Sequence, residues 1–255
     1  MTTRYPPGRC PAQGDGVGVS AVELPSLPAG AKIVNIQRGE TFIFEGDPAV
    51  HIYIVIAGNA KLYKMLPDGR RQIIGFGQAA TLLGLTSGMK YNFTAEAIDH
   101  IQLCRIPWEQ VQSVLGEFTA MGLRLLDIAI ADLGRAQDHA LLLGRKTATE
   151  KVATFLLFQL ARAQSPRAWP TQCRLAMSRV DIADYLGTAH ETITRALARL
   201  RRTGVIAVRD SHNIIIYNHG RLEAISNGFS EEPCAGRRDF TYHPAISLTN
   251  PVAAG

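Results

Sequence analysis

The sequence predicts an α+β fold with two domains: an N-terminal antiparallel β-roll, a long helix, and a C-terminal pair of short helices beside a β-hairpin. Three observations predict it. Short alternating apolar runs, separated by glycine-containing turns, continue as far as Ile106. Apolar residues then recur every three or four positions from Trp108. Beyond them, two short helical patterns meet at Gly187. With 255 residues, 46% of them hydrophobic, the chain is large enough for two cores.

The composition favours a cytoplasmic protein with a basic C-terminal domain. No apolar run approaches the roughly 18 residues of a membrane span, and proline and glycine interrupt the N-terminus, so neither membrane contact nor a signal peptide is expected. The net charge is +5. Residues 167–221 alone hold nine arginines against four acidic residues, an excess of the same size. The positive charge is therefore placed where it would meet nucleic-acid phosphates.

The first domain is expected to span residues 31–110, after a flexible, glycine- and proline-rich arm of residues 1–30. Pro67-Asp68-Gly69 is a strong hairpin signal between two of its strands. Short strands at such even spacing are typical of a compact antiparallel barrel or roll. The predicted strands are 32–37, 41–44, 51–57, 60–66, 70–75, 93–97 and 102–106.

The segment from Trp108 to about Leu143 predicts one long helix, of which residues 111–143 form a separate unit between the domains. This helix is longer than one small domain needs, and it is apolar on more than one side. Core packing explains part of that surface, and a partner helix would explain the rest. The next helix is predicted from Thr147 to Ala163, within a second domain of residues 144–226.

Residues 178–202 predict two helices joined by a tight turn. Ser178 can cap the first helix, and Asp181 is its reciprocal partner in a capping box. Gly187 ends that helix, as a residue free to adopt positive φ should. The second helix runs from about His190 to Arg202. Its apolar residues fall on one face: Ile193, Ala196, Leu197 and Leu200.

The opposite face of that second helix carries Glu191, Thr194 and Arg195, whose spacing places them on one side. An arginine can hold guanine O6 and N7, a glutamate can accept from cytosine N4, and a threonine methyl can pack on thymine. The alternative is a solvated Glu–Arg pair on an amphipathic helix. The two-helix pattern and the basic residues around it favour reading of DNA bases from the major groove.

A β-hairpin follows the second helix. Gly204 ends the helix, and residues 205–208 and 213–217 predict two strands joined at Asp210-Ser211-His212. We call this hairpin the wing. Arg209 in the wing would contact DNA phosphates; the alternative is that the tip of the hairpin is only solvated. Residues 220–226 predict a short helix. Residues 227–255 show little periodicity and are expected to be a disordered tail.

The two-helix stretch resembles the DNA-binding motif of the CRP/FNR superfamily of bacterial transcription regulators. Glu191-Thr192-Ile193-Thr194-Arg195 is similar to the Glu-x-x-Ser/Thr-Arg pattern of the FNR/FixK branch. The runs 177–187 and 141–148 (Leu-Leu-Leu-Gly-Arg-Lys-Thr-Ala) look specifically FixK-like. The strand-rich segment resembles the cyclic-nucleotide-binding-type β-roll of the same superfamily. The resemblance covers residues 31–226.

The resemblance implies a homodimer, formed through the long helix, that binds an inverted repeat of TTGAT-type half-sites in double-stranded DNA. It implies RNA polymerase as a further partner. Arg195 would contact guanine, Glu191 the exocyclic amine of the opposite strand, and Thr194 a thymine. The predicted DNA-binding residues are Glu191, Thr194, Arg195, His190, Ser178, Arg179, Arg201, Arg202 and Arg209.

No cofactor is expected. Nucleotide-binding members of the superfamily use an arginine and an acidic residue in the roll, yet no arginine occurs between Arg71 and Arg105. Oxygen-sensing members hold an iron–sulfur cluster with four cysteines, whereas the N-terminal cysteine cluster is missing here. The alternative is a regulator gated by nucleotide, heme or a redox thiol. Cys173 and Cys104 are the candidates for such a thiol.

Two further expectations follow from the residues. No catalytic triad, metal cluster or phosphate-binding loop is present in the sequence, so no enzymatic activity is expected. The family usually continues Gly-Leu-Thr after the first helix of the motif, whereas this chain has Gly187-Thr188-Ala189. Because alanine cannot cap a helix through its side chain, the start of the second helix is expected to lack its usual cap unless Thr188 substitutes.

Overall fold

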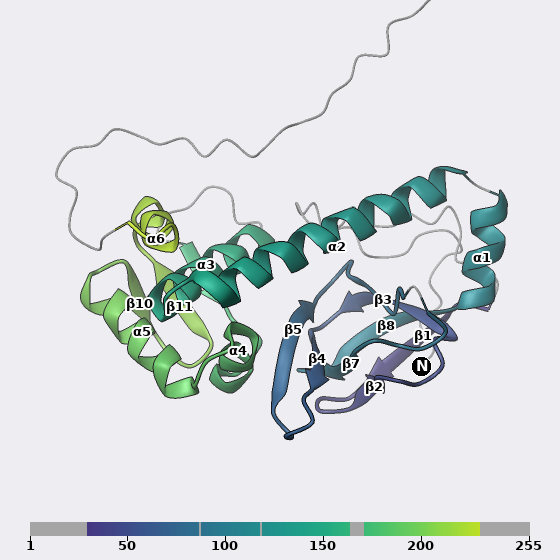
Figure 1. Ribbon diagram of the computed structural model, residues 1–255, viewed down its shortest axis with the longest axis horizontal. Coiled ribbons are helices and arrows are strands. Elements are labelled where there is room, and N and C mark those ends of the chain that lie inside the picture. The colour runs from purple at the N-terminus through teal and green to yellow at the C-terminus, as the bar shows by residue number, and fades with distance from the viewer. Residues whose placement is uncertain (1–29, 87, 118, 164–170, 230–255) are drawn as a thin grey trace, which may run out of the picture.

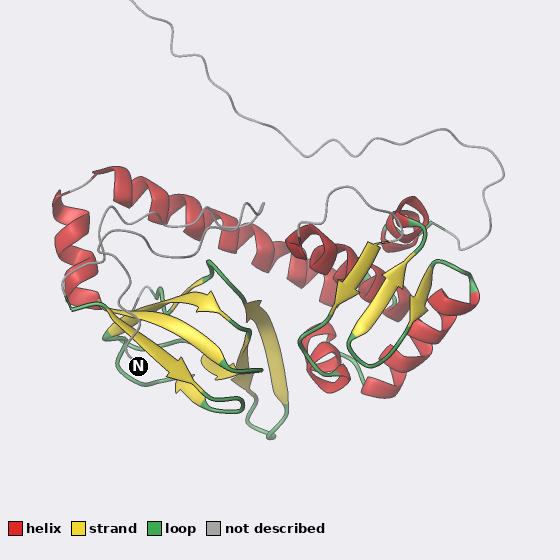
Figure 2. Cartoon of the chain, turned by 180° about the vertical axis from the view of Figure 1, so that it is seen from behind, coloured by secondary structure: helices red, strands yellow, loops and turns green. Residues whose placement is uncertain are grey.

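The computed structural model describes residues 30–86, 88–117, 119–163 and 171–229. Figure 1 shows two lobes connected by a long helix, α2 (Thr119–Arg145), which runs along both. The N-terminal lobe is built mainly from strands, and the C-terminal lobe combines helices with a small sheet (Figure 2). The expected arm of residues 1–30 and tail of residues 227–255 lie almost wholly outside the described residues.

Two four-stranded antiparallel sheets form the N-terminal roll, with strand orders β1-β8-β3-β6 and β2-β7-β4-β5. Between the sheets lies a core in which Val55, Ala95 and Leu103 are fully buried. The strands are β1 (Lys32–Ile36), β2 (Thr41–Ile43), β3 (His51–Ala57), β4 (Ala60–Met65), β5 (Arg71–Gly77), β6 (Leu82–Leu83), β7 (Thr94–Ala97) and β8 (Ile101–Pro107).

All seven sequence-predicted runs of the roll form strands, and their ends agree within two residues. The hairpin at Pro67-Asp68-Gly69 is also present, with Gly69 at φ +84° and a backbone hydrogen bond of 2.8 Å from Leu66 to Arg70. Strand β6 was missed because two residues are too few to show alternation.

The prediction of one continuous helix from Trp108 is wrong. The structure has two helices, α1 (Trp108–Glu117) and α2, which run in different directions in Figure 1. Trp108 and Val111 pack against the roll and hold α1 at its end. Apolar spacing reports which face of a helix is buried but not where the axis turns, so the sequence did not locate this break.

Helix α2 has a second apolar face besides the one that packs on the roll. Leu125 and Ile128 belong to the core shared with the roll. In contrast, Leu126, Ile130 and Leu133 are 54%, 58% and 58% exposed. We call this exposed row the α2 stripe; it consists of Leu123, Leu126, Ile130, Leu133 and Leu141. Its first four members are spaced by three and four residues, as in a coiled-coil seam, and Leu141 follows eight residues after Leu133.

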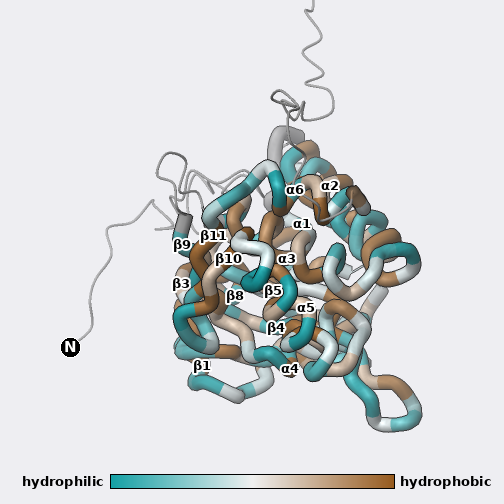
Figure 3. Tube along the Cα trace, turned by 90° about the vertical axis from the view of Figure 1, so that its left-hand side faces the viewer, coloured by the Kyte–Doolittle hydropathy of each residue, from teal (hydrophilic) through white to brown (hydrophobic). Residues whose placement is uncertain are grey.

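The C-terminal lobe places a three-stranded sheet of order β10-β11-β9 against four helices. Figure 3 colours β11 largely brown, in line with the burial of Ile214 and Ile216. Strand β9 was not predicted. The elements are α3 (Ala148–Ala163), β9 (Thr171–Arg174), α4 (Arg179–Leu186), α5 (His190–Arg202), β10 (Ile206–Val208), β11 (Asn213–Ile216) and α6 (His219–Ser226).

The described helices do not include one with both the length and the apolar character that a membrane crossing requires.

Candidate DNA interface

Helix α4, the first of the helix-turn-helix pair, begins with the complete capping box that the sequence predicts. The Ser178 hydroxyl accepts a hydrogen bond from the Asp181 backbone N–H at 3.1 Å. In return, the Asp181 carboxylate accepts from the Ser178 N–H at 3.1 Å and from its hydroxyl at 2.6 Å. Because its hydroxyl is bound within the protein, Ser178 is better explained as a cap than as a DNA contact.

Arg179 is the first residue of α4 and lies near Asp210 of the hairpin turn. Its side chain is half-buried. Burial lowers the pKa of its guanidinium, and the nearby Asp210 charge acts in the opposite direction. This placement beside the hairpin suits a contact with the DNA backbone rather than with a base edge.

Gly187 ends α4 in the left-handed region, at φ 58° and ψ 47°, as predicted. Its N–H donates to the Ala183 carbonyl. A Cβ at this position would lie 3.0 Å from Leu143 Cδ2 and 3.8 Å from Gln72 Oε1. Glycine is thus needed both for the turn and for the close approach of α2.

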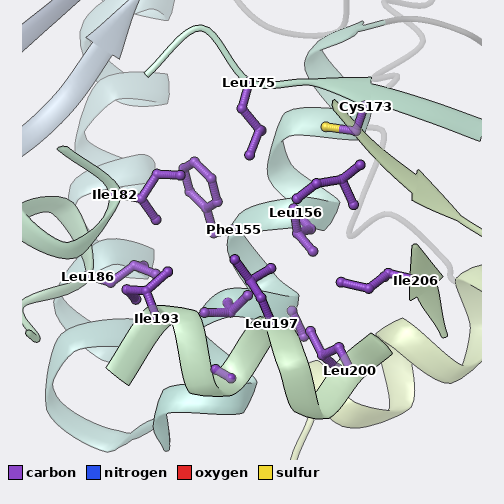
Figure 4. Packing of buried hydrophobic residues seen from close by; sticks show 14 of the residues in the cluster. Phe155, Leu156, Cys173, Leu175, Ile182, Leu186, Ile193, Leu197, Leu200 and Ile206 are labelled. Atoms are coloured by element: carbon purple, nitrogen blue, oxygen red, sulfur yellow. The ribbon is translucent and has the colours of Figure 1, made fainter. Parts of the chain in front are cut away.

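Helix α5 is amphipathic along its whole length. Four of its residues are buried in the core of the lobe: Ile193, Ala196, Leu197 and Leu200. Figure 4 shows Ile193, Leu197 and Leu200 directed toward Phe155 and Leu156 of α3. This packing fixes which side of α5 faces solvent.

The exposed side of α5 carries Glu191, Thr194 and Arg195 together, as predicted. His190 Nδ1 lies 3.2 Å from Glu191 Oε1, and their side chains are 54% and 64% exposed. The Thr194 hydroxyl donates to the His190 carbonyl at 3.1 Å. With its hydroxyl bound to the helix backbone, Thr194 keeps its methyl group for an apolar contact.

Three further predicted arginines of this lobe are exposed. Arg201 and Arg202 are exposed in the last turn of α5, and Arg209 is exposed beside the wing turn. Asp210 shapes that turn, because its carboxylate accepts from the N–H groups of His212 and Asn213 at 2.8 and 2.9 Å. All three arginines are exposed cations, a side-chain type that suits contact with DNA phosphates.

The expected absence of a side-chain cap on α5 is confirmed. Ala189 occupies the cap position with φ −73° and ψ 149°, and no side chain there accepts a hydrogen bond from the first turn. The backbone conformation is the one that a capping serine adopts, so only the hydroxyl is missing.

Ala189→Ser is therefore expected to stabilise the C-terminal lobe. The serine hydroxyl would accept from an N–H of the first turn of α5 and raise the free energy of unfolding by about 1 kcal/mol. Denaturant unfolding followed by circular dichroism measures this change. Ala189→Val, which adds volume without an acceptor, serves as the control. Equal stability of the serine and valine variants would contradict the prediction.

The C-terminal end of α4 is held by side chains of three other elements. His139 Nε2 of α2 lies 2.8 Å from the Tyr185 carbonyl, and Lys151 Nζ of α3 donates to the Leu186 carbonyl at 3.1 Å. Gln72 Nε2 of β5 donates to the Asp184 carbonyl at 2.7 Å. These carbonyls belong to the last turn, where the helix itself supplies no donors.

His139 makes this anchoring sensitive to pH. Its ring stacks on Tyr185 with centroids 4.2 Å apart, and burial lowers its pKa below the ordinary 6.5, with the charge of Lys151 adding to the shift. The unfolded chain therefore binds the proton first as the pH falls. We expect the free energy of unfolding to decrease below about pH 6.5.

Thermal unfolding between pH 5 and 7.5 measures that decrease. His139→Gln keeps a donor for the Tyr185 carbonyl but cannot titrate, so its stability should depend less on pH than that of the wild type. Parallel pH curves for the two proteins would contradict the role of His139.

Both candidate redox thiols are buried. Cys104 lies in β8 and Cys173 in β9, each 1% exposed. Burial raises the pKa of the Cys173 thiol to about 11. Oxidation proceeds through the thiolate, so a thiol that stays protonated and inaccessible is a poor switch. These surroundings weigh against the redox alternative at Cys173. Cys10 and Cys234 lie outside the described residues.

The residues of the roll do not fit a cyclic nucleotide. Lys90 is the only lysine or arginine between Arg71 and Arg105, and it is exposed. The acidic Glu96 is bound to Lys61 in an ion pair of 2.8 Å. A buried cyclic phosphate needs a fixed cation, which these positions do not supply.

Within the described ranges, no group of three or more His, Cys, Asp or Glu side chains is placed to hold a metal ion. An iron–sulfur cluster has no ligand set there either, since the two described cysteines belong to different lobes.

Sequence reasoning missed the contacts that join the roll to α4. Arg71 and Gln72 were noted only as part of a turn motif, yet both side chains bind α4. No local pattern could have identified them, because their partners lie more than 100 residues further along the chain.

Comparison with known proteins agrees with this architecture. Residues 150–225 match the model of the Crp-like helix-turn-helix domain, and residues 33–118 match that of the cyclic nucleotide-binding domain. The nitrogen fixation regulation protein FixK of Bradyrhizobium diazoefficiens is 37% identical over 82% of this chain and 87% of its own. The transcriptional activatory protein AadR of Rhodopseudomonas palustris is 39% identical over 70% and 74%.

A solved structure extends the comparison to three dimensions. FixK2 from Bradyrhizobium japonicum superposes with a TM-score of 0.71 at 35% identity, over 76% of this chain and 96% of that one. The roll, the long helix and the helix-turn-helix thus occur together in a related protein. The chain belongs to the CRP/FNR family of DNA-binding transcription regulators, and within that family it is FixK-like.

Proposed function

We propose that the protein binds, as a homodimer, to an inverted repeat of TTGAT-like half-sites, without cAMP or an iron–sulfur cluster. The observation that carries this proposal is the exposed face of α5. There Glu191, Thr194 and Arg195 lie together while the opposite face is buried. Arg195 would hold guanine, Glu191 would accept from the amine of the opposite strand, and the Thr194 methyl would pack on thymine.

Phosphate contacts would come from the arginines around that face. Arg201 and Arg202 follow the helix, while Arg179 and Arg209 flank the wing. His190, at the first position of α5, would approach the backbone beside Glu191. Such contacts set the register of the protein on DNA and supply most of the salt-dependent affinity.

The α2 stripe supports the dimer. Its five large apolar side chains are each more than half exposed on a face that the described residues leave uncovered, and the first four follow coiled-coil spacing. A second copy of the same helix would bury them in a parallel, two-fold interface. Two-fold symmetry would then place two α5 helices on an inverted repeat.

The proposed independence from effectors rests on the roll, whose residues provide neither a phosphate cation nor a cluster of thiolates. RNA polymerase is the further partner we propose, on the basis of the family. We place the protein in the cytoplasm, because its site of action is DNA.

The test is DNA binding by purified protein, measured by fluorescence anisotropy with a labelled inverted repeat of TTGAT. We expect tight, reversible binding of two subunits per duplex in air and with reductant, unchanged by added cAMP. A duplex with scrambled half-sites is the control. Equal affinity for both duplexes would reject the site, and a one-to-one complex would reject the dimer.

The second candidate function is an effector-gated sensor, with nucleotide, heme or a thiol acting in the roll. Calorimetry with cAMP and an absorption scan in the Soret region distinguish it from the proposed function. Three results would reject effector independence in favour of an effector-gated sensor. They are a measurable heat of cAMP binding, a Soret band in the purified protein, and DNA binding that occurs only after oxidation.

A further inference from the structure

Helix α4 contacts the roll as well as α5. Strands β4 and β5 of the roll present Lys61, Arg71 and Gln72 to α4, which presents Asp181 and Asp184 in return. We call these five residues the β5–α4 clamp. They lie between the two lobes, in the region where Figure 1 draws β5 beside α4.

Arg71 makes the principal polar contacts of the clamp. Its Nε and Nη2 atoms donate to one oxygen of Asp184 at 2.9 and 2.7 Å, and Nη2 also donates to Asp181 Oδ1 at 3.1 Å. The side chains of Arg71, Asp181 and Asp184 are only 24%, 10% and 26% exposed. Charge-assisted hydrogen bonds so shielded from water are stronger and more directional than surface ion pairs.

The contact between the lobes is apolar as well as charged. Phe76 at the end of β5 reaches the core of the C-terminal lobe, with its ring centroid 5.3 Å from that of Tyr185 and 6.4 Å from that of Phe155. Arg162 Nη1 of α3 donates to the Phe76 carbonyl at 3.2 Å. Strand β5 is therefore packed against the lobe that carries α5.

The clamp has a geometric consequence for DNA recognition. Helices α4 and α5 share one core and are joined by the short turn at Gly187, so they move together. Fixing α4 on the roll fixes the direction of α5 relative to the roll. The roll in turn packs on α2 through Ile128 and Leu125, next to the α2 stripe. The clamp thus links α5 to the axis of a dimer formed by that stripe.

We infer that Arg71 is a positioning residue that sets the separation between half-sites which the dimer accepts. This inference rests on the proposed function, because it needs two α5 helices on one DNA site. With the clamp intact, the two helices are held at one separation, and other spacings require the lobes to move. Without Arg71, each C-terminal lobe gains freedom, which lowers affinity for the best site and reduces the penalty for other spacings.

Variants can be chosen that leave the helix-turn-helix itself intact. Asp181 also caps α4, so it is not replaced. Asp184→Asn removes the negative charge of the principal contact at an unchanged side-chain length, and Arg71→Gln removes the guanidinium with a shorter, uncharged side chain. Arg70→Ala is the matched control, because it removes the same positive charge at the neighbouring position. Arg70 is 77% exposed and binds Asp68 within its own turn.

The experiment measures affinity for a series of duplexes in which the separation of the two TTGAT half-sites changes by one base pair at a time. We expect the wild type and Arg70→Ala to prefer one separation. For Arg71→Gln, affinity at that separation should fall about tenfold, which is comparable to the free energy of one of the three charged hydrogen bonds that the variant loses. The preference over sites two base pairs shorter or longer should fall by a similar factor. Asp184→Asn should behave alike, and the double variant should add little.

The outcomes separate the inference from the function on which it rests. A wild type without any preferred separation would reject the proposed dimeric site. If the wild type has such a preference and Arg71→Gln keeps it, whether or not affinity falls uniformly, the positioning role is overturned. Base preference within a half-site and thermal unfolding are measured alongside. If Arg71→Gln lost base preference or thermal stability while Asp184→Asn kept both, the change in spacing preference would be due to damage to the fold. This result would also overturn the inference.

Discussion

Ile130→Glu is expected to separate the two subunits and abolish tight DNA binding. Ile130 lies in the middle of the α2 stripe and is 58% exposed. Burying one isoleucine contributes about 1.5–3 kcal/mol. Because the substitution is present in both subunits of a two-fold dimer, the free energy of dimerisation should weaken by about 3–6 kcal/mol. The like charges brought together by the two glutamates add to this loss. Sedimentation equilibrium measures the dimer dissociation constant, and anisotropy measures binding of the inverted repeat.

Ala131→Glu is the matched control. Ala131 is exposed and lies one residue further along α2, outside the stripe, so the same added charge should leave the dimer intact. If Ile130→Glu and Ala131→Glu had the same dissociation constant as the wild type, the α2 stripe would not be the dimer interface.

Arg195→Ala is expected to reduce affinity for the inverted repeat by about 1–3 kcal/mol for each half-site and to relax the preference for guanine. Arg195 is exposed on the face of α5 opposite to Ile193 and Leu197, so its removal leaves the core unchanged. Competition with duplexes that carry each of the other bases at the guanine position measures the preference.

Arg201→Ala distinguishes a base contact from a phosphate contact. Arg201 is exposed in the last turn of α5, and its loss should weaken binding to all sequences equally and lower the slope of log affinity against log salt by about 1. If Arg195→Ala behaved in this uniform way too, Arg195 would be a phosphate contact, and the assignment of guanine to it would be wrong.

The helix-turn-helix was accessible from the sequence because its determinants are local. The capping box joins residues three apart, the end of α4 depends on one glycine, and the bounds of α5 follow from apolar residues within four positions of each other. The missing cap at Ala189 was visible for the same reason. In the roll, period-two alternation and glycine turns located all but the shortest strand.

Other features depend on contacts between distant parts of the chain. The break between α1 and α2 follows from packing of each helix on the roll, and the high pKa of Cys173 follows from burial within the C-terminal lobe. Neither burial nor the direction of an axis is encoded in residue spacing. The sequence therefore predicted one continuous helix where the structure has two, and it offered Cys173 as a candidate thiol without showing that this residue is buried.

The sequence by itself determined which face α5 exposes to solvent, since periodicity along one helix separates its buried face from Glu191, Thr194 and Arg195. Only the tertiary structure decided how that helix is held. Arg71 meets Asp184 across 113 residues of chain, and that meeting exists only because the roll and the C-terminal lobe pack together. Local interactions determine which face of α5 is exposed, and long-range contacts fix the direction of that helix.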